Sequence, residues 1–442
     1  MRLLITNTNE VQAYTILRSL RSQAERIVAT DGLSSVAPLG YGGMALYSRF
    51  LDAKYPVPGF SSDWLAGRLQ SDNTVAEETY MQRIEEICRL ESVDTIFPSL
   101  DPEVYLFSKN KQRLAEQGIL AVVPEPEVIR VPMDKAATIR AAQRVGFPCP
   151  KTYFPETIED LELIRQDSKP PWIVKPRFTA HGENMEYVEG PAQLEAAYAK
   201  VRALQHAPIV QEYIKGGLRC NYYVTVGRDG QILSMLTPRV VRTHRSGYRV
   251  SSKTCISAST APYVEELRAL LADLQLWGGY TIQTQIDPRD ATPKLLEINP
   301  RLGQHLWWRT GLGVNEPMIL LQLARNETPS GNFVFPDNVV LLDPYHDFFF
   351  LFGYIVESMF GLIGQLLRGR RDDADGRDSV LLTVRLHVRD YLNRKPKIFC
   401  PEVANLLVDP YPCVRAYWVE FRRIMVGFFG RLVSFRRHKV NA

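Results

Sequence analysis

The chain has 442 residues, of which 45% are apolar and 23% are charged, and its formal net charge is +4. This composition excludes a disordered or low-complexity chain, and the length allows about two to four folded domains. The positive charge gathers in residues 411–442, which hold seven Lys or Arg and one acid, so the rest of the chain is not a general nucleic-acid binder.

The cysteine pattern and the N-terminus favour a cytoplasmic protein. Six cysteines are scattered without the spacing of a zinc site, which is typical of reduced thiols. The first residues lack the long apolar segment and the cleavage site of a signal peptide.

Residues 1–130 alternate between predicted strands and helices, which favours a parallel, Rossmann-like sheet. Strands are expected over 2–6, 25–31, 94–100 and 119–124, and helices over 10–23 and 74–92. Asp101 and Glu103 follow the third of these strands, and we interpret them as an N-cap and first-turn acids of a helix. A position turned toward a functional site is the alternative.

A second pattern covers residues 131–330, with helices beside antiparallel strand pairs. A helix from residue 133 ends at a glycine and two prolines within 146–150. The further expected elements are strands around a loop in 170–190, a helix over 191–206, a strand over 207–214, a hairpin over 220–243, a helix over 262–276, strands over 280–287 and 293–299, and a helix over 314–325.

The strands over 280–287 and 293–299 carry polar side chains on alternate positions. Gln283, Gln285 and Asp287 share one face of the first strand, and Glu297 and Asn299 share one face of the second. Oxygen ligands from neighbouring strands suit a hard cation such as Mg²⁺. A solvated polar face on an exposed hairpin is the alternative, but the apolar surroundings favour the metal site.

Two lysines and one apolar strand fit a phosphate-containing ligand. Lys135 opens a helix directly after an acid, and Lys175 ends an apolar strand that precedes a loop. The strand at 210–214 ends near a glycine pair and can offer backbone groups to a flat base. Surface lysines and an ordinary buried strand are the alternatives.

The order of these pieces resembles the ATP-grasp superfamily, in its carboxylate–amine ligase and carbamoyl-phosphate-synthase-like branch. The resemblance covers about residues 1–330 and rests on "DKAATIRAAQRVGFPCPKT", "WIVKP", "VQEYIKGG", "GGYTIQ" and "LLEINPR". It implies an α/β and α+β chain: a Rossmann-like pre-grasp domain over 1–130 and a two-lobed ATP-grasp domain over 131–330, with a smaller lid lobe at about 140–210. A helical C-terminal extension over 331–442 follows.

The resemblance also implies ATP and Mg²⁺ as ligands, with two ions expected and Mn²⁺ as an alternative. Lys135 and Lys175 would contact the phosphates, and Gln283, Glu297 and Asn299 would hold the ions. Arg301, Arg239 and Arg242 would neutralise the transferred group and cover the phosphates. The nucleotide contacts that the resemblance implies are His181, Gln211, Glu212, Tyr213, Ile214 and Asn221.

Two features depart from the family pattern. Leu218 and Arg219 stand where many members have an acid that binds the ribose hydroxyls, so Asn221 is a candidate replacement. The loop after Lys175 has a single glycine, Gly182, beside His181, where the family has several. Neither change removes a predicted metal ligand, so we expect an active enzyme.

The acceptor pocket is expected between the pre-grasp domain and the loop after Arg301. Gln304, His305 and Arg309 are candidates there, with His244 as a weaker one near the phosphates. Trp307 and Trp308 are candidates for the same pocket, with packing in the core as the favoured alternative.

The C-terminal part has two apolar segments. The stretch 348–367 is long enough to cross a bilayer, but Glu357 and several glycines argue against a span. Residues 415–440 have the pattern of a basic amphipathic helix. Such a helix packs on its own domain, on a second copy in a homodimer, or on a membrane surface, which would make the protein peripheral.

These observations favour an ATP-dependent ligase that joins a small carboxylate to an amine through an acyl phosphate, without nucleic acid as a partner. A second hypothesis is an ATP-grasp enzyme that phosphorylates an enol or keto oxygen before an amine displaces it. A third is a non-catalytic, nucleotide-binding, membrane-associated module, which Leu218, Arg219 and the basic tail motivate.

Overall fold

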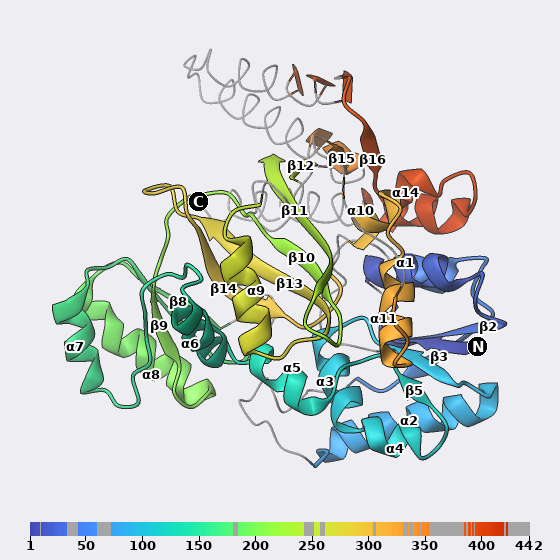
Figure 1. The fold of residues 1–442 in the computed structure, drawn as a ribbon, viewed down its shortest axis with the longest axis horizontal. Helices are drawn as coiled ribbons and strands as arrows, with labels where there is room; N and C mark the ends of the chain where they lie inside the picture. The colour runs from blue at the N-terminus through green and yellow to red at the C-terminus, as the bar shows by residue number, and fades with distance from the viewer. Residues whose placement is uncertain are drawn as a thin grey trace, which may run out of the picture.

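The computed structural model is shown in Figure 1. It describes residues 1–8, 10–32, 43–59, 72–179, 184–242, 252–256, 261–303, 306–329, 335, 339–344, 347–349, 351–352, 384–385, 388–389, 391–392, 394–419 and 421–422, without the side chains of 239–242, 252–256 and 402.

The N-terminal part is a five-stranded parallel sheet in the order β3-β2-β1-β4-β5. The strands are β1 (Arg2–Ile5), β2 (Arg26–Gly32), β3 (Ala53–Val57), β4 (Thr95–Phe97) and β5 (Leu120–Ala121). The helices are α1 (Val11–Leu20), α2 (Val75–Glu91), α3 (Asp101–Lys109) and α4 (Lys111–Ala115), with a short 3₁₀ turn, η1 (Met44–Tyr47). The predicted Rossmann-like alternation is therefore confirmed.

The strand β3 was not predicted, and its sequence shows why. Pro56 lies inside it, and a proline cannot donate to a strand pair from the middle of a sheet. In the structure β3 is the edge strand and pairs only with β2 among the described strands, so the proline is tolerated.

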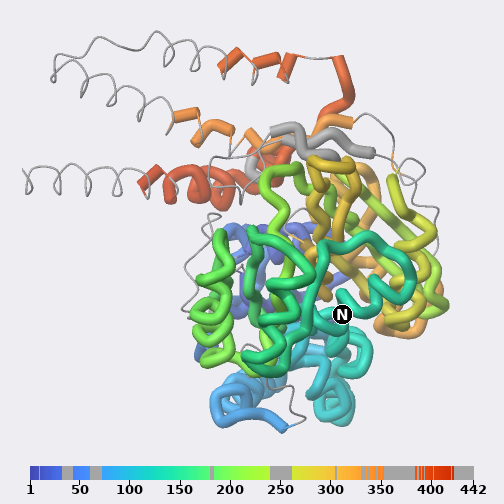
Figure 2. Tube along the Cα trace, turned by 90° about the vertical axis from the view of Figure 1, so that its left-hand side faces the viewer, coloured from blue at the N-terminus to red at the C-terminus, as the bar shows by residue number. Residues whose placement is uncertain are grey.

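A small four-stranded antiparallel sheet follows, in the order β6-β9-β7-β8. Its strands are β6 (Thr152–Tyr153), β7 (Trp172–Lys175), β8 (Glu186–Val188) and β9 (Ile209–Glu212). The helices α7 (Asp160–Asp167) and α8 (Leu194–Leu204), with the short turn η3 (Pro191–Gln193), complete a separate apolar core that includes Leu161, Trp172 and Tyr198. This lobe lies at one end of the molecule in Figure 1 and faces the viewer in Figure 2.

The largest sheet has seven strands in the order β14-β13-β10-β11-β12-β15-β16. The strands are β10 (Tyr222–Val226), β11 (Ile232–Arg242), β12 (Ser252–Ile256), β13 (Gly278–Ile286), β14 (Pro293–Asn299), β15 (Val340–Leu342) and β16 (Lys397–Phe399). The helices beside it are α5 (Pro126–Met133), α6 (Lys135–Val145), α9 (Val264–Asp273), α10 (Leu306–Gly311) and α11 (Glu316–Ala324). The helices α6 and α9 share an apolar core with β10, β13 and β14.

The region 331–442 is less purely helical than expected. It contributes β15 and β16 to the large sheet, where they pair in parallel, as well as α14 (Pro401–Ala404) and helical residues 410–419. Both strands are only three residues long, which is too short for a periodic pattern to reveal.

The C-terminal segment also packs on the first helix of the chain. Figure 1 shows α14 beside α1. Cys413 and Ala416 are fully buried in the core that contains Leu17 of α1. The Tyr14 hydroxyl donates to Asp409 Oδ2 at 3.1 Å, although the two residues are 395 positions apart.

Among the described residues, no helix is both long enough and apolar enough to cross a bilayer. Most of the stretch 348–367 and most of the predicted amphipathic helix 415–440 lie outside the described residues.

Two acids at the start of α3 are buried, which the N-cap interpretation did not anticipate. Asp101 and Glu103 lie in the first turn as expected, but the N-cap residue is Leu100, and the two acidic residues are 6% and 5% exposed. Glu103 accepts hydrogen bonds from Thr6 Oγ1 at 2.7 Å and from Tyr80 Oη at 2.6 Å. The first-turn placement of both acids is therefore confirmed, whereas the N-cap role is wrong, because Leu100 is the N-cap residue and both acids accept interior hydrogen bonds.

The Glu103 carboxyl is expected to make the stability of the protein depend on pH. Burial raises its pKa to about 7, so the folded state holds a proton that the unfolded state releases near pH 4.5. The free energy of unfolding should therefore fall by roughly 3 kcal/mol as the pH rises between these two values. Glu103→Gln should remove this fall, which urea unfolding at pH 5 and pH 8 would measure.

Glu86→Gln is the matched control, because the Glu86 side chain is 59% exposed on the neighbouring helix α2. It should leave the pH dependence unchanged. Equal pH dependence in wild type and Glu103→Gln would contradict the prediction.

Candidate active site

The hairpin of β13 and β14 brings the predicted metal ligands together. Its register places Gln283 opposite Glu297 and Thr281 opposite Asn299. These residues occupy the same face of two neighbouring strands, so the side chains of Gln283, Glu297 and Asn299 lie close to one another. Of the two candidate glutamines, Gln283 is the one that faces Glu297.

A β-bulge lies directly before this group. The pairing passes from Glu297 to Leu295 and skips Leu296. Because of the extra residue, Leu295 and Ile298 both reach the core beneath α6 and α9 although they are three positions apart. Strict alternation thus fails at Leu296, while Glu297 and Asn299 still face the same side.

Gln285 and Asp287 serve other contacts. Gln285 Nε2 donates to the Ile214 carbonyl at 3.2 Å and also to the Gly216 carbonyl. Asp287 is fully buried and pairs with Arg289 and with Lys294 Nζ at 2.6 Å. Both residues therefore fix the backbone around the group of Gln283, Glu297 and Asn299.

Lys135 enters this group from α6. Asp134 caps that helix by accepting from the Ala136 amide at 2.9 Å, and α6 packs against β14. The Lys135 ammonium lies 3.1 Å from Glu297 Oε2 and donates to the Thr179 carbonyl at 3.0 Å. The residue is only 4% exposed, so a surface lysine is excluded.

Lys175 comes from the small sheet and is also buried. Its Nζ donates to Gln211 Oε1 at 2.6 Å, and Gln211 Nε2 donates in turn to Thr152 Oγ1 at 2.8 Å. Gln211 is fully buried, so its amide orients the lysine. Burial lowers the pKa of Lys175 to about 8, although the nearby Glu297 works against that shift.

The charge of Glu297 is maintained by these lysines. Burial works to raise the pKa of its carboxyl, but Lys135 and Lys175 outweigh that effect, so the pKa lies below its ordinary value. The side chain is 24% exposed, which leaves it accessible from one side. The arrangement is therefore an ionised acid between two buried ammonium groups, which suits a bound anion together with a cation.

Arg301 follows the hairpin and is tied to the N-terminal part. Its Nε donates to Asp101 Oδ2 at 2.7 Å, and the side chains of Arg301 and Asp101 are 15% and 9% exposed. The other carboxylate oxygen, Asp101 Oδ1, is buried and has no hydrogen-bond partner among the described residues. Asp101 thus contacts a candidate site residue, which fits the alternative considered for it, a position turned toward the site.

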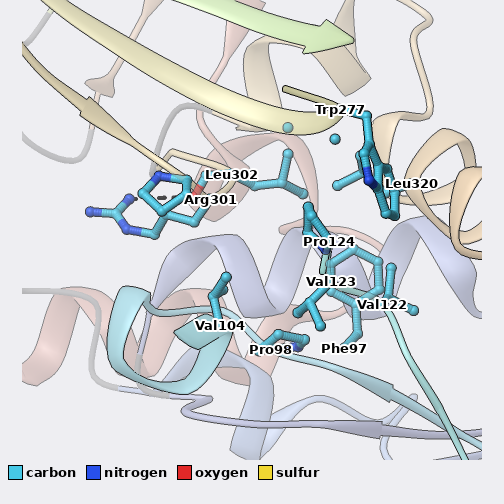
Figure 3. Close-up of a pocket in the computed structure, with 13 residues that line it drawn as sticks. Phe97, Pro98, Val104, Val122, Val123, Pro124, Trp277, Arg301, Leu302 and Leu320 are labelled. Atoms are coloured by element: carbon cyan, nitrogen blue, oxygen red, sulfur yellow. Dashed lines mark hydrogen bonds between the residues drawn. The ribbon is translucent and has the colours of Figure 1, made fainter. Parts of the chain in front are cut away.

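A small cavity of about 30 Å³ lies beside Arg301, between the N-terminal sheet and β13. Among the described residues that line it, Arg301 is the only charged one, and Figure 3 shows its guanidinium group on the side away from Trp277 and Leu320. The glycines at the start of β13 permit this close approach, because a Cβ on Gly279 would lie 2.7 Å from Leu302 Cδ2. The apolar lining holds the stem of Arg301 and leaves its charge at one end.

The segment predicted to contact a base lies at the end of β9. Glu212 pairs with Arg289 Nη1 at 2.5 Å, and Tyr213 packs edge-on against Tyr187 with ring centroids 5.1 Å apart. Ile214 is 5% exposed. Asn221 uses its amide within the sheet, where Oδ1 accepts from the Thr284 amide at 3.3 Å.

Several predicted residues lie outside what the structure describes. His181, His244, Gln304 and His305 are not among the described residues, and the side chains of Arg239 and Arg242 on β11 are not described.

The pocket role considered for Arg309 is wrong. Arg309 is 1% exposed and pairs with the fully buried Glu316, so it faces the interior rather than a pocket. Trp307 and Trp308 are also buried, as the core interpretation predicted.

Two side-chain contacts in the candidate site were not predicted from the sequence. Asp101 and Arg301 are 200 positions apart, so no local sequence pattern predicts that they pair. Arg219 was noted as a departure, but its guanidinium Nη1 in fact donates to Gln283 Oε1 at 3.3 Å. The alternation of polar residues at 219, 221 and 223 is the signal that could have found it.

The group is chemically suited to a hard cation. The described residues contain no cluster of three His, Cys, Asp or Glu, so the candidate ligands are one carboxylate and two amides. Asn299 Nδ2 and Thr281 Oγ1, opposite each other in the hairpin, are buried without hydrogen-bond partners among the described residues. Such atoms are expected to be satisfied by a bound group, and a half-turn of the Asn299 amide presents its oxygen.

Comparison with known proteins adds an independent finding. Residues 133–304 match the family model of the ATP-grasp domain. The carbamoyl phosphate synthase large chain of Thermus thermophilus is 24% identical over 293 residues, which are 62% of this chain and 28% of that protein. The formate-dependent phosphoribosylglycinamide formyltransferase of Leptothrix cholodnii is 23% identical over 162 residues, which are 34% of this chain and 39% of that protein. This chain therefore spans less than half the length of these relatives.

Two solved structures have the same fold over most of the chain. The biotin carboxylase domain of 2-oxoglutarate carboxylase from Hydrogenobacter thermophilus gives a TM-score of 0.58 at 15% identity and covers 76% of this chain and 72% of that one. Biotin carboxylase from Campylobacter jejuni gives the same TM-score and identity and covers 76% of this chain and 73% of that one. The predicted α/β and α+β fold class is confirmed by this likeness.

Proposed function

The chain carries an ATP-grasp domain over residues 133–304, and from this premise we propose that it is an ATP-dependent ligase that joins a small carboxylate to an amine. The observation that carries the proposal is the ion pair of Lys135 with Glu297 at 3.1 Å, with Gln283 opposite Glu297 and Lys175 nearby. Such a group binds a polyphosphate and a divalent cation together.

The two lysines hold the phosphates. Lys135 and Lys175 are both less than 8% exposed, so their charges act in a medium of low dielectric, where they are stronger than in water. Gln211 orients Lys175, which reduces the reorganisation needed when the phosphates arrive.

Mg²⁺ is the proposed ion, with Gln283, Glu297 and Asn299 as its ligands. When bound, the ion would neutralise phosphate charge and polarise the phosphoryl group. One ion or two, and Mn²⁺ in place of Mg²⁺, are compatible with three oxygen ligands. The magnesium salt of ADP is present in the Hydrogenobacter structure, which supports this choice.

Arg301 is proposed to act on the acceptor carboxylate and the transferred group. A carboxylate oxygen would attack the terminal phosphorus as the bond to ADP breaks, which gives an acyl phosphate. The amine would then attack the acyl carbon, and inorganic phosphate would leave with the electron pair. Asp101 accepts from Arg301 Nε, and Arg301 Nη1 donates to the Leu302 carbonyl at 3.4 Å, so Nη2 is the guanidinium nitrogen that we propose binds these oxygens.

The base contacts remain proposals that the family resemblance supports. Glu212, Tyr213 and Ile214 would line the adenine, with Gln211 behind them and Asn221 as a candidate for the ribose. His181, Arg239 and Arg242 would cover the phosphates.

We also propose a cytoplasmic location and consider two occupants for the C-terminal surface. Leu407, Tyr411 and Trp418 are 97%, 61% and 63% exposed. The basic segment 415–440 continues from this surface in the sequence, which supports a peripheral membrane contact. A second copy of the chain, in a homodimer, is the other candidate occupant; a dimer is named in the Hydrogenobacter structure.

A screen of ADP release against libraries of acids and amines, with mass detection of the product, tests the proposed reaction. Release should require one acid and one amine together, and the product mass should equal their sum less one water. A product in which the amine has replaced an enol or keto oxygen would select that activity instead. Tight ATP binding without stimulation by any pair would contradict both reactions.

A further inference from the structure

The helical residues 410–419 have two apolar faces. On the inner face, Cys413 and Ala416 are fully buried in the core that contains α1. The outer face repeats apolar residues at helical spacing, and they are 61%, 58% and 63% exposed: Tyr411, Val414 and Trp418. A helix that packs only on its own domain usually has polar residues on its outer face. The outer face is therefore suited to contact a second surface.

An aromatic cluster joins this helix to a distant segment of the chain. Its six rings come from residues 348–352 and 417–421 and contact one another in an unbroken series, with centroids 5.7–6.3 Å apart: Phe349, Tyr417, Phe348, Phe352, Phe421 and Trp418. Phe349, at the inner end, is 6% exposed, whereas Phe348 and Trp418 are 51% and 63% exposed. The aromatic cluster therefore extends from the core to the surface.

The sequence continues from the aromatic cluster in two apolar stretches. Phe352 belongs to the stretch 348–367, whose only charged residue is Glu357. Trp418 belongs to the segment 415–440, in which apolar residues recur at helical spacing. The aromatic cluster thus lies where two apolar sequences come together in the fold.

The charge around the aromatic cluster is positive. Arg422 is exposed directly after Phe421, and residues 411–442 hold seven Lys or Arg against one acid. Near an anionic membrane each such residue contributes about 1 kcal/mol of attraction. A twofold dimer through this surface would instead bring the basic segments of both copies together, where like charges repel. The charge therefore favours an anionic surface over a second copy of the chain.

The exposed residue types fit a membrane surface as well. Tryptophan and tyrosine are enriched where a bilayer meets water, because their rings are apolar and each carries one polar group. Basic residues beside an apolar helix face are typical of helices that lie in this interface. The aromatic cluster combines both properties at one place.

We propose that the aromatic cluster and the outer face of the helix 410–419 bind the surface of a membrane that contains anionic phospholipids. This inference selects one of the two occupants considered above for the C-terminal surface. It does not depend on the ligase reaction, because none of these residues belongs to the candidate active site.

Flotation of the full chain with lipid vesicles tests the inference. The wild type should float with vesicles of phosphatidylcholine that contain about 30% phosphatidylserine, and not with phosphatidylcholine alone. The double variant Trp418→Ser with Tyr411→Ser should bind the anionic vesicles at least about tenfold more weakly, because two exposed aromatic rings are lost. Raising the salt from about 0.1 M to about 1 M should also weaken binding, because it screens the basic charges.

Leu90→Ser with Leu163→Ser is the matched control. These two leucines lie on α2 and α7 and are 66% and 65% exposed, so the control removes apolar residues of nearly equal exposure elsewhere. It should bind the vesicles as the wild type does. Both double variants should keep the wild-type melting temperature, because exposed side chains contribute little to stability.

Each further result has a defined meaning. Equal binding of the wild type and the Trp418→Ser, Tyr411→Ser variant would overturn the inference, because charge alone would then explain the attraction. Failure of the wild type to bind anionic vesicles would also overturn it. If analytical ultracentrifugation then showed a dimer that this variant weakens, the surface would belong to a second copy. ADP formation without lipid should be the same in the wild type and the variant, so the ligase proposal is tested separately.

Discussion

Glu297→Gln is expected to lower the rate of ADP formation about a thousandfold while the chain stays folded. The carboxylate is the only anion among the three candidate ion ligands, and its partner Lys135 lies 3.1 Å away. Glutamine has nearly the same shape but no charge, so it weakens the hold on a cation and leaves the charge of Lys135 less balanced. Lys135 retains the Thr179 carbonyl as an acceptor, which limits the cost in stability.

A coupled assay of ADP formation, with melting temperatures alongside, measures this effect. Glu265→Gln is the control, because the Glu265 side chain is 86% exposed on α9. Its turnover should equal that of the wild type. If Glu297→Gln turned over ATP at the wild-type rate, the enzyme proposal would fail, and the non-catalytic hypothesis would become the better account.

Glu316→Gln is expected to lower the free energy of unfolding by about 3–5 kcal/mol. Glu316 and Arg309 are 0% and 1% exposed, and Arg309 Nη1 lies 2.5 Å from Glu316 Oε1. Burial works against both charges: it raises the pKa of Glu316 and lowers the pKa of Arg309 despite their attraction. Removing the acid therefore leaves a buried guanidinium without its counter-charge.

The double variant Arg309→Met with Glu316→Leu separates the pair from the space it fills. It removes both charges at similar volume, so its stability should lie within about 2 kcal/mol of the wild type. Urea unfolding followed by circular dichroism measures both variants. A loss in Glu316→Gln smaller than that of the double variant would contradict the view that the unpaired charge causes the damage.

The local part of the site could be predicted from the sequence, because it depends on patterns that span only a few residues. Two-residue alternation is enough to align Glu297 with Asn299, and helix-start chemistry is enough to place Lys135 after Asp134. The bulge at Leu296 was not visible in the sequence, since it depends on how β14 packs against α6. Glu297 and Asn299 still face the same side of the strand, because the bulge lies before Glu297.

The long-range part could not be predicted. Asp101 meets Arg301 only because the N-terminal sheet lies against the start of β13, and nothing in either segment specifies its partner. The buried pair of Arg309 and Glu316 could not be predicted either. An arginine beside two tryptophans suggests a binding pocket, and only the fold shows that Glu316 lies against it. The three-residue strands β15 and β16 are too short to have a recognisable period.

The hydrogen bond between Tyr14 and Asp409 has a consequence for the synthesis of the chain. The ribosome makes the two residues 395 positions apart, which at about 5–20 residues per second corresponds to roughly 20–80 s. During that time α1 lacks the partners that Cys413 and Ala416 later provide in its core. The core around α1 therefore gains these contacts only after residues 409–416 have been synthesised.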